Sequence, residues 1–232
     1  MEHPNVTRAL EGEPERELTR QPLGNQVYEA LLSRLISLKL PPGARISIDA
    51  LARELNVSQT PIRAALIRLE AEGLVAKTHN IGFSAAPMPT RQRFEEIYDL
   101  RLLLEPYMAG RAAQQMTTAQ KDALLAIERQ MTSLDCDDAK VAYGRFAVAD
   151  AEFHAWISEY GHNALAAETL ARLHSHMHLF RLRFHSQVTE EAIGEHRAIL
   201  DALLGGDAER AAQAMRTHIL RSRERLSPFF GE

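Results

Sequence analysis

The fold of the N-terminal part of the chain is decided by residues 58–70, SQTPIRAALIRLE. Apolar residues recur there at positions i, i+3, i+4 and i+7, which predicts a helix that buries one face. These residues are Ile62, Ala65, Leu66 and Leu69. Ser58 is a favourable N-cap residue for this helix. Pro61 falls in the first turn, where its missing amide hydrogen would have had no intrahelical partner. The stretch therefore predicts a helix that begins just after Ser58.

The segments around this helix predict a unit of three helices and a hairpin. A first helix over about 24–38 ends at Pro41-Pro42-Gly43, and a short second helix begins after Ser47. A tight turn at 56–57 leads into the third helix, which Gly73 ends. Two short strands, over 74–77 and 82–85, then flank the turn at 78–81. This order is that of a winged helix-turn-helix, which we predict over residues 21–88.

Polar residues occupy the exposed first turn of the third helix. They are Gln59, Thr60 and Arg63. In a helix-turn-helix this turn meets base edges and phosphates. A capped surface helix with a solvated polar face is the alternative for this helix taken alone. The complete order of elements favours recognition of DNA.

The composition is that of a folded protein in a reducing compartment. Of 232 residues, 45% are hydrophobic and 25% are charged, and one cysteine, Cys136, provides no disulfide framework. No apolar run approaches the ~20 residues needed to cross a bilayer, which predicts a cytoplasmic protein with no membrane partner. Residues 1–20 are polar and without apolar periodicity, so we expect a mobile arm.

Charge is distributed unevenly along the chain, whose net charge is −4. Residues 21–88 hold seven Lys or Arg against five Asp or Glu, whereas residues 89–232 hold 17 against 21. A mildly basic part therefore precedes an acidic one. This balance suits a DNA-binding module joined to a second domain.

Residues 89–232 predict only helices. They begin with the end of the linker Pro87-Met88-Pro89, and Thr117 and Gln120 form a capping-box pattern. Six helices are expected, over about 91–115, 117–134, 139–160, 164–185, 190–204 and 208–227. The chain is thus predicted to be mainly α, with a winged helix-turn-helix of three helices and a small hairpin followed by an all-α six-helix bundle.

A candidate metal site lies within this bundle. Asp150 and His154 are spaced i, i+4, so they share a helix face. From His196 the chain rises about eight residues, roughly 12 Å, before Gly205-Gly206, and returns about ten residues, roughly 15 Å, to His218. An antiparallel helix pair would bring both imidazoles to nearly the same height. One carboxylate and three imidazoles suit Zn²⁺ first, with Ni²⁺ and Mn²⁺ as alternatives. Ordinary helix-surface contacts and satisfied core histidines are the competing interpretation.

Two longer stretches resemble known families. Residues 24–86, with LARELNVSQTPIRAALIRLEAEGLV and the wing HNIG, resemble the DNA-binding domain of GntR-type transcriptional regulators. Residues 92–226, with DAEFH and EHRAILDALLGGDAERAAQAMRTH, resemble the FCD domain of the FadR-type subfamily. The first resemblance implies that seven residues approach DNA, the last two from the wing: Ser58, Gln59, Thr60, Pro61, Arg63, His79 and Asn80. Gln59, Ala64 and Ile81 depart from the residues usual in the family, which bears on the operator sequence and not on the fold.

The second resemblance implies a ligand as well as a metal. Asp150, His154, His196 and His218 fill the four positions of the family's metal ligands. A buried cation there would anchor the carboxylate of a small organic acid. The residues expected to line its pocket are Arg101, Asn163, His174, His178 and Arg181, of which the last three are predicted to share a helix face.

The function expected from both halves is that of a transcription regulator. It would be a repressor, not an enzyme, and would bind a pseudo-palindromic DNA operator as a homodimer under the control of the acid effector. A metal-dependent hydrolase using the four Asp and His residues is the alternative, since an open metal position can activate water. It leaves the winged helix without a role. A structural nucleoid-type DNA binder would require a far more basic chain.

Overall fold

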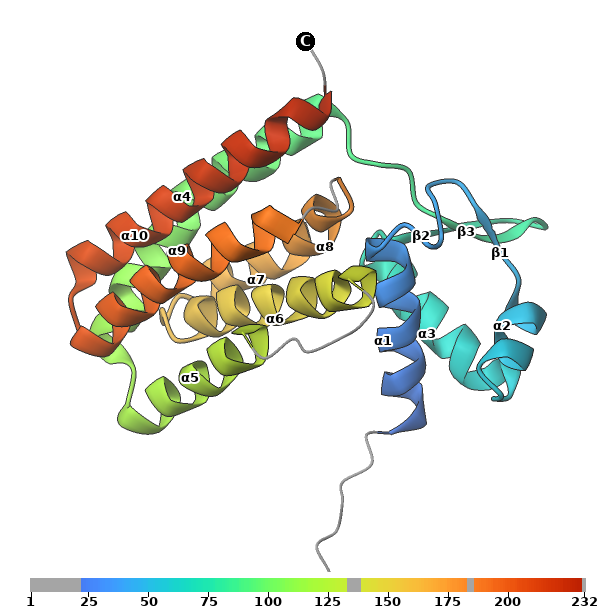
Figure 1. The fold of residues 1–232 in the computed structure, drawn as a ribbon, viewed down its shortest axis with the longest axis horizontal. Helices are drawn as coiled ribbons and strands as arrows, with labels where there is room; N and C mark the ends of the chain where they lie inside the picture. The colour runs from blue at the N-terminus through green and yellow to red at the C-terminus, as the bar shows by residue number, and fades with distance from the viewer. Residues whose placement is uncertain (1–21, 133–138, 183–185, 231–232) are drawn as a thin grey trace, which may run out of the picture.

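The computed structural model describes residues 22–132, 139–182 and 186–230, so the predicted arm lies outside the described residues. A winged-helix part and a helical bundle lie side by side, with α1 next to the N-terminal part of α6 (Figure 1). The first part contains α1 (Leu23–Ile36), β1 (Arg45–Ile46), α2 (Ile48–Glu54), α3 (Gln59–Ala71), β2 (Val75–Thr78) and β3 (Gly82–Ala85). The second contains α4 (Arg91–Gln115), α5 (Thr118–Thr132), α6 (Ala139–Glu159), α7 (Ala164–Leu173), α8 (Ser175–Phe180), α9 (Ser186–Gly205), α10 (Ala208–Leu226) and a 3₁₀ turn (Ser227–Phe230).

The helix predicted to begin just after Ser58 is α3, and its four predicted apolar residues are all buried. Ser58 precedes it as the N-cap residue, but its side chain makes no capping hydrogen bond, which differs from the expectation. Ser47 does cap α2, since its hydroxyl accepts a hydrogen bond of 3.3 Å from the amide of Ala50. The first turn of α3 therefore has no capping hydrogen bond from the Ser58 side chain.

The wing is a three-stranded antiparallel sheet in the order β1-β3-β2. Strands β2 and β3 form the predicted hairpin, with Val75 opposite Ala85. Strand β1 was not predicted, because two residues are too short to show the alternation that marks a strand. It pairs Arg45 with Ser84 and so ties the segment before α2 to the wing.

The bundle confirms the all-helical prediction with one correction. The single helix expected over 164–185 is divided into α7 and α8 at His174, whose φ of 44° is left-handed. A left-handed residue interrupts the helical hydrogen bonds, and neither glycine nor proline marks the position in the sequence. Seven α-helices are therefore described in residues 91–226 where six were expected. The capping box is confirmed, since Gln120 Oε1 accepts from the amide of Thr117 at 2.8 Å.

Helix α6 belongs to both cores of the molecule. Its residues Tyr143 and Ala147 pack into the winged-helix core, whereas Phe146 and Phe153 pack into the bundle core. Between them Gly144 faces Ser33 of α1 so closely that an added Cβ would lie 2.9 Å from the serine hydroxyl. The two parts are thus joined through a shared helix. Among the described residues, no helix has the length and apolar character of a membrane span.

Candidate metal centre and DNA-reading surface

Four buried side chains from three helices meet in the bundle. They are Asp150 and His154 of α6, His196 of α9 and His218 of α10, and one ligand atom of each lies within 4.8 Å of all the others. The Nε2 atom of His196 lies 3.2 Å from Oδ1 of Asp150. The ring centroids of His196 and His218 are 4.6 Å apart, as expected for an antiparallel pair of helices. The structure therefore brings together all four predicted ligands.

Two glutamates orient two of these imidazoles through hydrogen bonds with the Nδ1 atom of each ring. Nδ1 of His154 lies 2.5 Å from Oε2 of Glu105, and Nδ1 of His218 lies 2.9 Å from Oε2 of Glu195. An ionised carboxylate only accepts hydrogen bonds, so each Nδ1 is the donor and each Nε2 keeps its lone pair. Metal-bound histidines are held in this way.

Each glutamate is held in turn by an arginine. Arg101 donates from Nε to Oε1 of Glu105 at 2.5 Å, and Arg225 donates to both carboxylate oxygens of Glu195, at 2.6 and 2.9 Å. Burial alone would raise the pKa of Glu195, but hydrogen bonds from His218 and Arg225 lower it to about 2. Two Arg–Glu–His chains thus converge on the cluster. Sequence analysis missed both glutamates and Arg225; the i, i+4 spacing of Arg101 and Glu105 was the one local signal.

The cluster has the properties of a cation site. Burial lowers the pKa of His218 to about 3, so its ring is neutral. The two neighbouring histidines act in the same direction, and the hydrogen bond with Glu195 opposes them. Within the described residues, neither ring nitrogen of the fully buried His196 makes a hydrogen bond, although its Nε2 lies 3.2 Å from Oδ1 of Asp150. Leaving a buried polar atom unsatisfied costs about 1–3 kcal/mol. A divalent ion would coordinate one of these two nitrogens, and three imidazoles with one carboxylate are a suitable ligand set.

Three cavities adjoin the cluster, and two of them differ greatly in size. A cavity of about 20 Å³ is lined by Arg101, Asp150, His218 and Arg225 among others, and holds roughly one water molecule. A pocket of about 880 Å³ is formed mainly by α6 and α7, where its walls include His154, Glu105 and a series of alanines. His174, at the break between α7 and α8, also lines this second pocket. Arg101 and His174 therefore line separate cavities beside the cluster. A third cavity, of about 820 Å³, is lined by residues of α9 and α10 that include His218.

The other three predicted effector residues make different contacts. Asn163 caps α7, where its Oδ1 accepts from the amide of Ala166 at 3.2 Å. His178 packs against Gly73 at the end of α3, and Arg181 donates to the carbonyl of Ala86 at 2.6 Å. His174 lies at the helix break as the N-cap residue of α8, whereas His178 lies within α8 and Arg181 is its C-cap residue. His178 and Arg181 instead connect α8 to the winged-helix part.

The predicted DNA-reading residues lie together at the surface. Ser58, Gln59, Thr60 and Arg63 are exposed at the first turns of α3, and Pro61 is half-buried. Gln59 donates from Nε2 to Oδ1 of Asp49 at 2.5 Å, and Arg63 donates to Oε1 of Gln59 at 3.2 Å.

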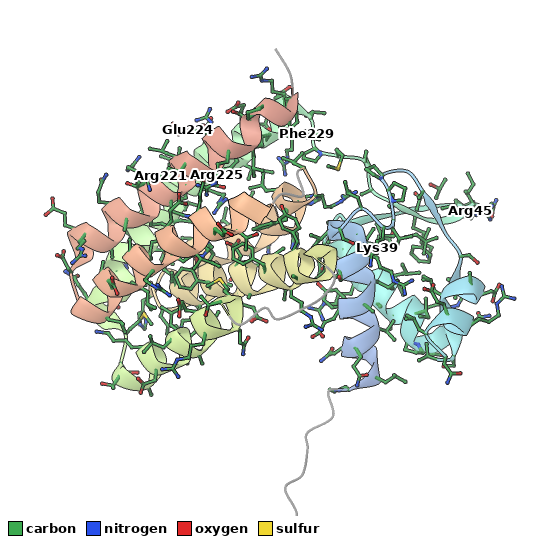
Figure 2. All side chains as sticks on the ribbon, in the orientation of Figure 1. Lys39, Arg45, Arg221, Glu224, Arg225 and Phe229 are labelled. Carbon is green, nitrogen blue, oxygen red and sulfur yellow. The ribbon has the colours of Figure 1, made fainter. Side chains whose placement is uncertain are left out.

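The wing carries the remaining DNA-binding candidates. His79 and Asn80 are exposed at its turn, where Asn80 has a φ of 60° and the amide of Ile81 donates to the carbonyl of Thr78. Arg45 of β1, which was not predicted as a DNA-binding residue, is also exposed. It projects from the winged-helix part far from α10 (Figure 2).

Comparisons with known proteins agree with both halves of the structure. Residues 23–84 match the family model of bacterial regulatory proteins of the gntR family, and residues 96–221, more than half of the chain, match that of the FCD domain. A relative from Streptomyces ambofaciens, an "Uncharacterized HTH-type transcriptional regulator in unstable DNA locus", is 31% identical over 83% of this chain and 80% of its own.

Two further proteins extend the comparison. The "Probable D-xylose utilization operon transcriptional repressor" of Paenarthrobacter nicotinovorans is 26% identical over 88% of each chain. The solved structure of McbR/YncC from E. coli superposes with a TM-score of 0.67 over 91% of this chain and 100% of that one, at 20% identity, and so supports the fold. The family and these relatives are transcription regulators and not enzymes, which removes the hydrolase alternative. The chain is therefore a member of the GntR family of bacterial transcriptional regulators, in the subfamily that carries a C-terminal FCD domain.

Proposed function

We propose that this protein is a repressor that binds a two-fold symmetric operator as a homodimer. A small carboxylate effector, bound beside a divalent ion in the bundle, would release it from DNA. The buried group of Asp150, His154, His196 and His218 carries the proposal, because these residues could hold a cation in the FCD domain that follows the DNA-binding module of this chain. Since operator DNA lies in the bacterial cytoplasm, this function places the protein there.

The reading surface would recognise DNA through α3 and the wing. Gln59 stands at the first residue of α3, exposed to solvent. A glutamine amide matches adenine, accepting from N6 and donating to N7, whereas arginine matches guanine. Arg63 and Thr60 would hold the register on the phosphates, and His79 and Asn80 would enter the minor groove.

The metal would give the bundle its affinity for an acid. Nε2 of His154, His196 and His218 with a carboxylate oxygen of Asp150 would hold it, Zn²⁺ being the first choice. When bound, the ion supplies a fixed positive charge to which a carboxylate can coordinate. Arg101 is placed to donate a second contact, because it lines the small cavity together with Asp150 and His218.

The size of the cavities bears on how the effector would bind. A volume of about 20 Å³ does not accept an organic acid, whereas the pockets of about 880 Å³ beside His154 and about 820 Å³ beside His218 do. We therefore place the body of the effector in the larger pocket, beside His154 and His174. Asn163, at the N-cap of α7, would order one wall of this pocket and not contact the effector.

Helices α6 and α8 would transmit binding to the DNA-binding part. In α6, Asp150 follows Ala147 of the winged-helix core by less than one turn. The pocket residue His174 directly precedes α8, and His178 of α8 and Arg181 just after it touch the end of α3 and the linker after β3. A shift of either helix on ligand binding would thus move the reading surface.

An apolar stripe on the outer bundle provides a surface for the second copy. Leu100, Leu103 and Tyr107 of α4 follow the spacing i, i+3, i+7 and are exposed, Leu103 at 71%. Leu220 adds to it from α10, which runs alongside α4 (Figure 1). A self-complementary stripe suits a two-fold dimer, and two recognition helices are needed for two half-sites.

The proposal is tested by selecting DNA and then releasing it. Duplexes with a random central segment are enriched on the metal-loaded protein, and the bound fragment is then challenged with a panel of small carboxylates. We expect one pseudo-palindromic sequence to be enriched and at least one acid to release it. Release that persists after Asp150→Asn and His218→Ala substitutions, with the metal removed, would contradict the role of the cluster.

A further inference from the structure

We infer that Asp49, a residue of α2 and not of the recognition helix, selects adenine over guanine in the operator by positioning Gln59. The inference rests on the proposed reading of DNA by α3. Asp49 lies in the first turn of α2, and its carboxylate accepts a 2.5 Å hydrogen bond from Gln59. It is therefore a positioning residue that acts on the base through another side chain.

The two neighbours of Gln59 fix which way its amide points. The carboxylate of Asp49 can only accept a hydrogen bond, and the guanidinium of Arg63 can only donate one. The amide nitrogen must therefore face Asp49, and the amide oxygen must face Arg63, at 2.5 and 3.2 Å. A flipped amide would place oxygen against oxygen and hydrogen against hydrogen. Gln59 is thus oriented before it meets DNA.

The oriented amide still has one donor and one acceptor to offer. Nε2 carries two hydrogens and uses one on Asp49, and Oε1 has two lone pairs and uses one on Arg63. The remaining N–H and lone pair are the complement of N7 and the N6 amino group of adenine. Pre-orientation lowers the entropy lost on forming a two-point contact. Adenine is therefore read by a rigid group and not by a mobile one.

The charge of Asp49 acts in the same direction. Guanine presents two acceptors, O6 and N7, in the major groove, and a nearby carboxylate repels both. Adenine presents an amino donor in place of one of them. A negative charge next to DNA also weakens binding to every sequence through the phosphates. Asp49 should therefore lower overall affinity while it raises discrimination, a combination typical of a residue that acts against the wrong partner.

Substitutions at Asp49 test this with a matched control on the same helix. The full-length metal-loaded protein and its Asp49→Ala, Asp49→Asn and Glu54→Gln variants are titrated with two duplexes that differ only in an A·T or G·C pair at the position read by Gln59. Glu54 is exposed on α2 and pairs with Arg34, so Glu54→Gln removes one charge without touching Gln59. Thermal unfolding confirms that all four proteins are folded.

We expect Asp49→Ala to reduce the preference for A·T by roughly tenfold, within the range for one bidentate base contact. Asp49→Asn, which keeps an acceptor oxygen, should retain more of the preference than Asp49→Ala. Both variants and Glu54→Gln should bind non-operator DNA more tightly than the wild type, but Glu54→Gln should keep the full A·T preference.

An unchanged A·T to G·C ratio in Asp49→Ala overturns the inference while leaving the regulator intact. An equal fall in Glu54→Gln overturns it too, because charge alone would then explain the effect. A wild type that enriches no sequence overturns the proposed function together with the inference, so the two failures are distinguishable.

Discussion

Coupling between the metal cluster and the DNA-binding part can be tested at one glycine, by the substitution Gly144→Ala. A Cβ at this position of α6 would lie 2.9 Å from the hydroxyl oxygen of Ser33, 3.3 Å from its α-carbon and 3.4 Å from its β-carbon. Rotation of the serine side chain can move the hydroxyl away. The α-carbon cannot move in this way, because it belongs to the backbone of α1. The two helices must therefore separate by a few tenths of an ångström.

The free energy of this change follows from two opposing effects. Overpacking of a tight interface costs about 1–3 kcal/mol. Replacing a glycine by alanine within a helix stabilises it by about 0.8–1 kcal/mol. The net destabilisation of Gly144→Ala is therefore expected at about 0–2 kcal/mol. Gly194 of α9 is the matched control, because a Cβ there would meet nothing within 4 Å and Gly194→Ala should be stabilising.

Thermal unfolding of both variants, followed by operator titrations with and without a releasing carboxylate, separates stability from coupling. The difference in unfolding free energy between Gly144→Ala and Gly194→Ala gives the steric cost, which we expect at about 1–3 kcal/mol. If the effector controls DNA binding through the contact between α1 and α6, Gly144→Ala should shift the effector concentration at which half of the DNA is released. The shift should be roughly tenfold for each 1.4 kcal/mol of steric cost. Ser33→Gly added to Gly144→Ala should restore it in part, because it removes the hydroxyl and the β-carbon but leaves the α-carbon in place. A Gly144→Ala protein that unfolds like Gly194→Ala and releases DNA like the wild type would refute coupling between the two helices at this point.

Four further predictions follow from the structure. His218→Ala removes one of the four clustered donors, so elemental analysis should find less bound metal while operator affinity without effector stays within about twofold, since the substitution acts in the bundle; full metal content would argue against the site. The pKa of His178 is lowered to about 4 by burial and by Arg181, so its neutral form is favoured in the fold. The unfolded chain then binds more protons than the folded chain between pH 6.5 and about 4. The free energy of unfolding should therefore decrease as the pH is lowered through this window, by roughly 1–2 kcal/mol at pH 5. Denaturant titrations should show a smaller loss in His178→Gln, and an identical pH profile would refute the assignment. Leu103→Asp places a charge in the apolar stripe and should yield monomers by sedimentation, whereas Leu165→Asp, at an equally exposed position on α7, should not; a dimer in both would move the interface elsewhere. Gln59→Arg should change the preferred base from adenine to guanine at one operator position, by roughly 1–3 kcal/mol, and selection of the same base by both proteins would show that Gln59 does not read DNA.

Features set by neighbours in the sequence were predictable. The buried face of α3 follows from the spacing of four apolar residues, and the capping box at Thr117 and Gln120 follows from two residues three positions apart. The convergence of His196 and His218 was predictable for a related reason. A helical hairpin with a turn at Gly205-Gly206 has a fixed rise per residue, so heights along the two helices follow from counting.

Features that depend on how helices cross and rotate were not predictable. The left-handed conformation of His174 divides one expected helix in two, and no glycine or proline at this position indicates the break. Glu105 lies 49 residues from His154 in the sequence, so nothing local links the two. The separation of His178 and Arg181 from the pocket likewise depends on where α8 packs.

The sequence by itself determined which residues could carry chemistry and on which helix each would lie, because helical periodicity is a local property of the chain. Only the tertiary structure decided that α6 serves two cores, with Tyr143 and Ala147 in one and Phe153 in the other. It also decided that two buried glutamates, each bonded to an arginine, hold the rings of His154 and His218. These features arise from side chains meeting across helix interfaces, where the crossing geometry and the exclusion of water set each interaction and leave no periodic trace in the sequence.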